Sequence, residues 1–359
     1  MPRSFPIIVI ACVITVMASV TAGQDQKLLR EAEHALTAGP FSVMQKERVP
    51  PSGDKHDFLT LAPYWWPDPT KPGGLPYIRR DGETNPESKR GTDDAVFVPM
   101  HLAVTTLAGA YRETRDERFA ARAALLLRTW FLDPATRMNP NMEYGQGIPG
   151  RNTGRGAGII STRNLVTVLD AARVLEASQS WPQRDRDALR EWCAAFATWL
   201  QTSKNGRDES TAQNNHGTWY DAQLGAALLY SGKRDQARAR FETSKQRIAS
   251  QIERDGRQPK ELERTRSWSY SVMNLEGWFN LARLADEAGV DVWNYRTSDG
   301  RSLRIALDYL MPFASGAAKW PEAQITPFDG AALVPLLDQA ARVWKDERYS
   351  TLADRLRQK

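Results

Sequence analysis

Cysteine is nearly absent from this sequence, which has two, Cys12 and Cys193, among 359 residues. Cys12 lies in an amino-terminal segment that we expect to be removed, which leaves Cys193 without a partner for an intrachain disulfide. A chain without disulfides must be held together by its core, and a hydrophobic content of 41% is enough to bury a large one. We expect Cys193 to be a small, buried apolar residue of that core.

Motifs for metal ions and nucleotide cofactors are also missing. The sequence has four histidines, and three of them, His34, His56 and His101, are scattered and suit surface or capping positions better than metal ligation. It contains no HExxH, no CxxC pair and no Asp/Asn-rich calcium loop, and no Walker or Rossmann glycine pattern follows a strand. The sequence therefore predicts a protein that uses neither a metal ion nor a cofactor.

A strong charge of one sign is lacking as well. The chain has 48 Lys and Arg against 43 Asp and Glu, a formal net charge of +5, and the two signs are interspersed without a long basic run. A nucleic-acid partner would require a clustered stripe of Lys and Arg, so we expect none. The mild positive bias is compatible with an anionic ligand.

The amino terminus has the pattern of a secretory signal peptide. Arg3 supplies a positive charge, a mostly apolar run covers residues 5–20, and residues 20–22, Val-Thr-Ala, give a small-x-small cleavage pattern. The apolar run is too short for a membrane span, so we expect none in the mature protein. We predict a signal peptide at residues 1–23 and a single domain at 24–359, a monomer located in the periplasm or outside the cell.

The rest of the chain reads as successive amphipathic helices, with little strand-like alternation. A weak internal repeat relates residues 111–119 to 341–349, each leading into a helix. Paired helices that bury one face against their neighbours form solenoids or closed rings. We therefore predict an all-α fold, an incomplete (α/α) toroid. The expected helical runs cover about 120–131, 163–178, 184–203, 210–230, 234–254, 268–288, 299–313 and 329–357.

Two stretches interrupt the helical pattern. Residues 56–92 are rich in proline, glycine, aromatics and arginine, and residues 139–158 are rich in glycine and asparagine. Long irregular loops in compact domains are usually functional or disordered, and this aromatic content argues against disorder. The glycines of the second stretch would let the backbone turn tightly beside a ligand. We predict that both stretches form walls of a cleft above the helices.

The segment Asn214-Asn215-His216 is the first candidate for chemistry, because adjacent amides beside a rare histidine are poor core material. The structural alternative is that Asn214 or Asn215 caps a helix and that His216 is a satisfied, partly buried histidine. The downstream partners of this segment favour the chemical interpretation.

Those partners lie in residues 261–271, which contain Arg264 and Tyr270. The two are six residues apart, so they can meet only through a bend from loop to helix, with Thr265 or Ser267 as the N-cap. An amide, an imidazole, a guanidinium and a phenol suit removal of a proton beside a carboxylate. The alternative makes Tyr270 a core aromatic and the arginines solvated.

Four motifs together resemble the alginate lyase superfamily of secreted polysaccharide lyases. They lie at 64–69 (Tyr-Trp-Trp-Pro-Asp-Pro), 76–82 (Pro-Tyr-Ile-Arg-Arg-Asp-Gly), 215–216 (Asn-His) and 264–270. The resemblance covers about residues 61 to 280. The superfamily includes mannuronan-cleaving lyases and a related branch with glucuronan-active enzymes, and the chain is similar to both. It implies an incomplete α/α toroid, in agreement with the helical pattern. It also implies an acidic polysaccharide or oligosaccharide as the partner.

The reaction that the resemblance implies is β-elimination at a 4-linked uronate. Asn215 with Arg264 would neutralise the carboxylate that makes H5 acidic. Tyr270 would protonate the leaving O4 oxygen, and in a syn elimination would also remove H5, with nearby cations lowering its pKa. His216 would be the base in an anti elimination and otherwise a partner on the carboxylate side. Asn164 and Asn152 compete with Asn215, because one branch takes its Asn from an earlier helix.

The same resemblance suggests residues that bind the sugar chain. Aromatic rings stack on pyranose faces, and guanidiniums pair with uronate carboxylates, preferably through two hydrogen bonds. A loop pinned to the scaffold by its aromatics is the structural alternative. The predicted substrate-binding residues are Tyr64, Trp65, Trp66, Arg79, Arg80, Asn164, Asn214 and Arg266.

Two other functions are alternatives to the lyase. A glycoside hydrolase on a similar toroid needs two opposed carboxylates, for which Asp93, Asp94, Asp221 and Glu276 are candidates without a comparable motif around them. A non-catalytic protein that binds acidic glycans would keep the aromatic platform without the chemistry. The production of unsaturated uronate ends would separate the lyase from both.

Overall fold

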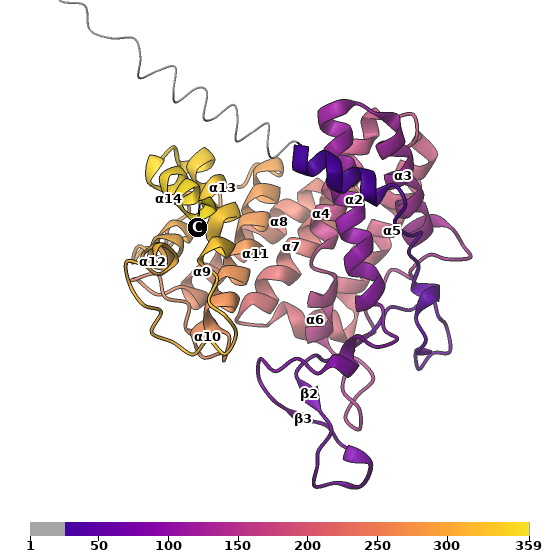
Figure 1. Cartoon of the computed structure of the whole chain (residues 1–359), viewed down its shortest axis with the longest axis horizontal. Coiled ribbons are helices and arrows are strands. Elements are labelled where there is room, and N and C mark those ends of the chain that lie inside the picture. Colours follow the sequence, from indigo (N-terminus) through magenta and orange to yellow (C-terminus); the bar gives the residue numbers. More distant parts are fainter. Residues whose placement is uncertain (1–25, 359) are drawn as a thin grey trace, which may run out of the picture.

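The computed structural model of the chain describes residues 26–358, and the predicted signal peptide, residues 1–23, lies outside these residues. Residues 26–35 are helical, and the later helices lie side by side in a curved array (Figure 1). The fold is an incomplete α/α toroid, as the sequence predicts. The helices are α2 (Asp94–Thr114), α3 (Glu117–Leu127), α4 (Leu165–Val174), α5 (Gln183–Thr202), α6 (Lys204–Ser210), α7 (Asn215–Tyr230), α8 (Arg234–Ser244), α9 (Gln246–Gln251), α10 (Pro259–Leu262), α11 (Ser267–Glu287), α12 (Leu303–Ser315), α13 (Val334–Trp344) and α14 (Glu347–Arg357).

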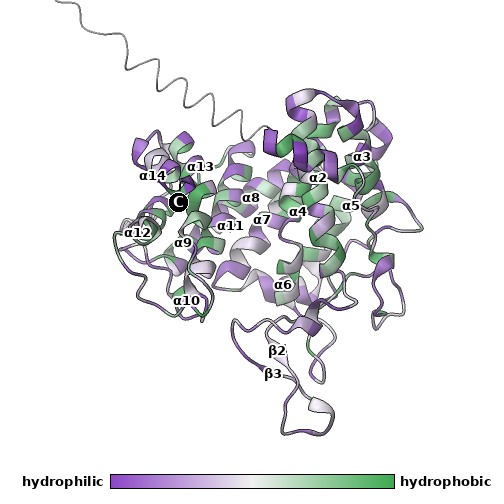
Figure 2. Ribbon diagram, viewed as in Figure 1, coloured by the Kyte–Doolittle hydropathy of each residue, from purple (hydrophilic) through white to green (hydrophobic). Residues whose placement is uncertain are grey.

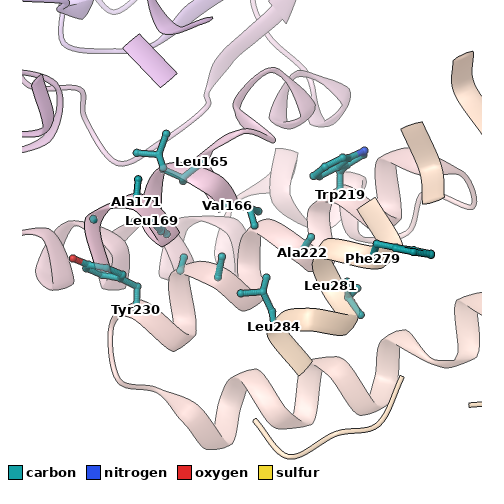
Figure 3. Packing of buried hydrophobic residues seen from close by; sticks show 14 of the residues in the cluster. Leu165, Val166, Leu169, Ala171, Trp219, Ala222, Tyr230, Phe279, Leu281 and Leu284 are labelled. Carbon is teal, nitrogen blue, oxygen red and sulfur yellow. The ribbon is translucent and has the colours of Figure 1, made fainter. Parts of the chain in front are cut away.

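Helices α7 and α11 pack against each other at the centre of the array. Every residue of α7 is buried except His216 and Leu229, so this helix is surrounded by its neighbours. Figure 3 shows Trp219 of α7, Phe279 of α11 and Leu165 of α4 among the side chains of this core. Most other helices carry both hydrophobic and hydrophilic residues (Figure 2), as expected where one face packs inward. Cys193 is fully buried, which confirms its predicted place in the core.

A buried polar layer lies between the two central helices. The Thr218 hydroxyl bonds to the side-chain oxygens of Gln251, at 2.9 Å, and Asn274, at 2.8 Å. The Asn274 amide donates to Gln258 at 2.8 Å, and the Trp278 indole donates to Gln251 at 2.9 Å. Buried polar groups that find partners specify one arrangement of the elements that carry them. This layer therefore fixes α7 and α11 relative to the end of α9 and the segment that follows it.

The two irregular stretches pair with each other rather than standing free. Strand β1 (Leu59–Leu61) pairs in parallel with β4 (Tyr144–Gly147), and β2 (Trp65–Trp66) pairs in antiparallel fashion with β3 (Ile78–Arg79). The β2–β3 hairpin projects from one end of the helical array (Figure 1). A Cβ atom on Gly158 would lie 2.1 Å from the Gly145 carbonyl oxygen. This glycine therefore permits contact between two backbones, where the sequence predicted contact between a backbone and a ligand.

Some predicted helical runs contain breaks. The run 234–254 divides into α8 and α9 at Lys245, and the run 329–357 divides into α13 and α14 at Lys345, which has a φ of 52°. The run 210–230 begins later than predicted, because Asn214 is the N-cap of α7. Helical periodicity persists across such breaks, since the flanking helices present apolar faces to the same core.

The weak internal repeat corresponds to the same local structure in both places. After α2, Arg115 has a left-handed φ of 59°, and the Asp116 carboxylate accepts from the backbone amide of Arg118. After α13, Lys345 has the left-handed conformation and the Asp346 carboxylate accepts from the amide of Arg348. The repeated sequence thus encodes a helix end followed at once by a capped helix start.

Asp221 provides a test of how the central helix is held. Its buried carboxylate accepts hydrogen bonds from Arg240, Arg247 and Ser244. Asp221→Asn should lower the free energy of unfolding by about 3 kcal/mol, because two guanidiniums lose their shared anion. Urea unfolding measures the change.

The matched control is Asp208→Asn, which removes an exposed partner of Lys204. This substitution should change the free energy of unfolding by less than about 1 kcal/mol. Equal effects of the two substitutions would contradict the structural role assigned to Asp221.

Candidate functional site

A cavity of about 460 Å³ lies where the starts of α7 and α11 meet the two irregular stretches. Five arginines line it, and no Asp or Glu among the described residues does so. A wall of this composition attracts an anionic ligand. The lining residues are Pro63, Tyr64, Trp65, Arg79, Gln146, Arg155, Ala157, Ile160, Arg163, Asn214, Asn215, His216, Arg264, Arg266, Ser269, Tyr270 and Met273.

Tyr270 and Arg264 meet in this cavity through a bend from loop to helix, as the sequence predicts. Arg264 follows α10, Tyr270 lies in the first turn of α11, and the guanidinium carbon is 3.8 Å from the centre of the phenol ring. The Arg264 Nη2 donates to the Tyr270 hydroxyl at 2.9 Å, and that hydroxyl donates to the Tyr64 hydroxyl at 2.7 Å. The phenolic oxygen is therefore held between a cation and a second phenol.

The predicted N-cap of α11 is wrong. The N-cap is Arg266, without a side-chain capping bond. The Thr265 hydroxyl instead donates to the Asp81 carbonyl at 2.7 Å, and the Ser267 hydroxyl donates to the Ala323 carbonyl at 2.6 Å. Both side chains therefore join the helix start to distant loops rather than cap it.

Asp81 holds the Arg264 guanidinium in place. The Nε and Nη2 atoms of Arg264 donate to this carboxylate at 3.1 and 2.6 Å, and the backbone amide of Thr265 donates to it at 3.1 Å. Although burial opposes ionisation, these hydrogen bonds hold the pKa of the Asp81 carboxyl well below its usual range. Arg264 is therefore already paired with an anion, which makes it a better partner for Tyr270 than a free neutraliser of a substrate carboxylate.

Arg264 lowers the pKa of Tyr270, as the sequence analysis expects of a nearby cation, but the net shift of this pKa in the free protein is upward. Burial raises the pKa of Tyr270, the neighbouring Tyr64 hydroxyl raises it further, and Arg264 offsets only part of the shift. Tyr270 therefore carries its proton at neutral pH. A neutral phenol in this place can donate a proton.

His216 is paired with a carboxylate that the sequence analysis missed. Its Nδ1 lies 2.6 Å from the Oε1 of Glu209, and that carboxylate is almost fully buried. A carboxylate on one ring nitrogen favours the tautomer in which the other nitrogen, Nε2, accepts a proton. Glu209 lies seven residues before His216 on the preceding helix, and no local motif marks it.

Asn215 is paired with a second buried carboxylate, Glu261. The Asn215 backbone amide donates to Glu261 Oε1 at 2.6 Å, and the Asn215 side-chain amide donates to Oε2 at 2.7 Å. Burial raises the pKa of Glu261 to about 6, against the lowering effect of these bonds, His216 and Arg264. Asn214 is both the N-cap of α7 and part of the cavity lining. The capping role and the functional role of this segment therefore coexist.

Some of the predicted substrate-binding residues line the cavity and others lie outside it. Tyr64, Trp65, Arg79, Asn214 and Arg266 belong to the lining. Trp66 and Arg80 do not. The Arg80 guanidinium lies 5.3 Å from the centre of the Trp66 ring, and the Trp66 indole donates to the Glu83 carbonyl at 3.0 Å. These two residues stabilise the β2–β3 hairpin, as the structural alternative for this loop anticipates.

The other asparagine candidates are also outside the lining. The Asn164 amide lies 3.4 Å from His101 Nδ1 at the start of α4, and the Asn152 side chain accepts from the Ile148 amide at 3.2 Å. Of the three asparagines that compete for the same role, Asn215 is the one that lines the cavity. The geometry therefore favours Asn215.

The carboxylates proposed for a glycoside hydrolase are not in the cavity either. Asp93 pairs with Lys46 in the core, Asp221 binds two arginines, and Asp94 and Glu276 are absent from the lining. A glycosidase needs two carboxyl groups facing the scissile bond. Since no carboxylate of residues 26–358 lines the cavity, this rival has no support.

Three residues of the cavity were missed by the sequence analysis. Arg155 and Arg163 have no carboxylate within ion-pair distance among the described residues, so their charges remain available to a ligand. Gln146 accepts from Arg155 at 2.8 Å and has a φ of 50°, which is uncommon for a residue other than glycine. Gln146 and Arg155 belong to the irregular stretch at 139–158, which was the available signal. Arg163 lies five residues beyond it, at the start of the helical run predicted at 163–178.

Comparison with known proteins decides the family. The family model described as alginate lyase matches residues 42–320. The chain belongs to the alginate lyase family. An alginate lyase from Bacteroides ovatus shares 39% sequence identity with it, with a TM-score of 0.89 over 92% of this chain and 89% of that one. Among curated proteins, none matches the chain.

More distant alginate lyases share the fold. Alginate lyase A1-III from Sphingomonas species A1 has a TM-score of 0.53 at 17% identity, over 90% of this chain and 88% of that one. A histidine-to-alanine variant of A1-III in complex with a tetrasaccharide has a TM-score of 0.59 at 17% identity, over 88% and 83%. Identity this low supports the fold alone.

Membership of the alginate lyase family makes this protein a polysaccharide lyase. Within residues 26–358, no helix is both long enough and apolar enough to cross a membrane. In the same part of the chain, no group of three or more His, Cys, Asp or Glu residues is placed to hold a metal ion.

The raised pKa of Glu261 predicts a pH-dependent stability. The folded protein keeps this proton up to about pH 6, whereas the unfolded chain loses it near the ordinary value of 4.5. Ionised Glu261 therefore destabilises the fold above pH 6, and this cost disappears as the pH falls below 4.5. Glu261→Gln should raise the free energy of unfolding by about 2 kcal/mol at neutral pH and leave it unchanged in acid. Urea unfolding across this pH range checks the prediction, and a gain that is independent of pH would contradict it.

Proposed function

We propose that this polysaccharide lyase cleaves a 4-linked uronate polymer, either alginate rich in mannuronate or glucuronan, by β-elimination. One observation carries the proposal. A cavity lined by five arginines, and by no carboxylate of residues 26–358, contains Tyr270 and His216 beside Asn215. This arrangement provides cations for a polyanionic chain, and an acid, a base and an amide donor for the reacting unit.

The reaction proceeds without water or a cofactor as a reactant. A base removes H5, the electron pair of the C5–H bond forms the C4=C5 double bond, and the C4–O4 bond breaks. The acid gives its proton to the departing O4. The products are a new chain end with a free hydroxyl and a 4,5-unsaturated uronate end.

The contacts favour a division of labour between Tyr270 and His216. Tyr270 keeps its proton in the free protein, so it suits the role of the acid. His216 is oriented through Nδ1 by Glu209, which leaves Nε2 to accept H5. Tyr270 could serve as both base and acid in a syn elimination if it first lost its proton, and Arg264 is placed to stabilise the phenolate.

The reacting carboxylate also requires a partner. Removal of H5 moves negative charge onto that carboxylate, so hydrogen-bond donors placed there lower the barrier. We assign this role to Asn215, and we assign Arg264 to Tyr270 because Asp81 already pairs with the guanidinium. The unpaired Arg155 and Arg163 would bind the carboxylates of neighbouring sugar units.

Tyr270→Phe tests the acid. The variant should retain binding and lose about a thousandfold in kcat, because the phenyl ring has no proton to give. Formation of ultraviolet-absorbing unsaturated ends from polymannuronate, polyguluronate and glucuronan measures the activity and identifies the preferred uronate. Tyr77→Phe is the matched control, since Tyr77 bonds to Glu87 and does not line the cavity. If no uronate polymer yields unsaturated ends with the wild-type protein, the proposed function is wrong.

Arg163→Gln tests the cationic wall. The half-buried Arg163 side chain makes no ion pair within the described residues, so the substitution should raise KM for an oligouronate about tenfold. The rise should shrink at high salt. Arg234→Gln, at an exposed position outside the cavity, should leave KM unchanged. An unchanged KM in the Arg163 variant would show that this arginine does not bind substrate.

A further inference from the structure

The side-chain amide of Asn215 is satisfied on one edge and unsatisfied on the other. Its nitrogen donates to Glu261 at 2.7 Å, whereas its oxygen, Oδ1, is buried and has no hydrogen-bond partner among the described residues. Asn215 as a whole has no exposed area, although it forms part of the cavity wall. A buried oxygen without a partner costs free energy, so its presence beside a ligand cavity requires an explanation.

The protonation state of Glu261 determines which edge of this amide can face it. An ionised carboxylate only accepts hydrogen bonds, so the NH₂ group must turn to it and Oδ1 is left unpaired. A protonated carboxyl can donate its O–H to Oδ1 while its other oxygen still accepts from the Asn215 backbone amide. The amide then turns over, and both N–H bonds become available to a ligand.

A uronate carboxylate in the cavity would favour the second arrangement. Such a ligand needs donors, and it repels an ionised Glu261 that lies just behind Asn215. We propose that Glu261 takes up a proton when a uronate carboxylate binds, and that this proton turns the Asn215 amide so that its NH₂ group faces the substrate. The proposal rests on the proposed function. Glu261 is in this account a positioning residue, because it acts through Asn215.

The surroundings of Glu261 are consistent with a change of protonation near neutral pH. His216 and Arg264 are the charged or titratable neighbours that act on it, and both favour the ionised form. Burial outweighs them and raises the pKa of Glu261 to about 6 in the free protein. A bound carboxylate raises this pKa further, so the group passes from mostly ionised to mostly protonated on binding at neutral pH.

Proton uptake on binding tests the proposal directly. Isothermal titration calorimetry in buffers of different ionisation enthalpy gives the number of protons taken up per site. The Tyr270→Phe variant prevents turnover, and the probe is a tetrasaccharide of the uronate that the wild-type protein cleaves fastest. We expect an uptake of about one proton for Tyr270→Phe at neutral pH.

The control carries Glu261→Gln in the same background, because the Gln side chain mimics the protonated carboxyl and cannot titrate. It should bind with similar affinity and with little or no proton uptake. An equal uptake in both variants would assign the proton to another group, such as His216, and would overturn the proposal. Binding of the tetrasaccharide without proton uptake would overturn the proposed role of Glu261 and leave the proposed function standing. Absence of binding would contradict the proposed function as well.

Turnover provides a second readout that a purely structural role would not give. Glu261→Gln should keep kcat within a few-fold and lose the decline of kcat/KM that ionisation of Glu261 causes above about pH 6. Glu261→Leu cannot bond to either edge of the amide and should lower kcat by at least tenfold. If the Gln and Leu variants are equally impaired, the protonated form of Glu261 is not the one that the reaction uses.

Discussion

The ion pair between Asp81 and Arg264 is the contact on which the arrangement of the cavity depends. It joins two residues that are 183 positions apart, one beside the β2–β3 hairpin and one before α11. Because the guanidinium is held at two nitrogens, its plane stays over the Tyr270 ring and its Nη2 stays on the phenolic oxygen. The same loop delivers Tyr64 to that oxygen. Loss of this pair would release the hairpin and the candidate acid together.

Three of the polar groups proposed for the chemistry have a carboxylate behind them. Asp81 holds Arg264, Glu209 holds His216 and Glu261 holds Asn215, and none of these acids lines the cavity. Groups that must act in a fixed geometry are oriented by partners outside the reacting layer. Keeping the anions in this outer position orients the site and leaves the cavity wall cationic for an acidic chain.

The sequence predicted the scaffold well and the supporting contacts poorly. Helical periodicity and the 215–216 and 264–270 motifs were enough to place the toroid and to bring Tyr270, Arg264, His216 and Asn215 to one cavity. Breaks at single residues, such as Lys345, were missed because the apolar pattern continues across them. Glu209 and Glu261 were also missed, since a buried carboxylate is chosen by tertiary packing and no local pattern distinguishes it among 43 acidic residues. Asp81 stands in the 76–82 motif, but nothing in the sequence indicates that it pairs with Arg264.

The central claim is that this cavity cleaves a uronate chain by elimination rather than by the addition of water. Mass spectrometry of oligouronate cleavage in heavy-oxygen water tests it most directly, because hydrolysis adds one solvent oxygen for each bond cleaved and elimination adds none. The account predicts unsaturated ends that have lost the mass of one water and products that contain no heavy oxygen from the solvent. Saturated products with one heavy oxygen for each bond cleaved would contradict it.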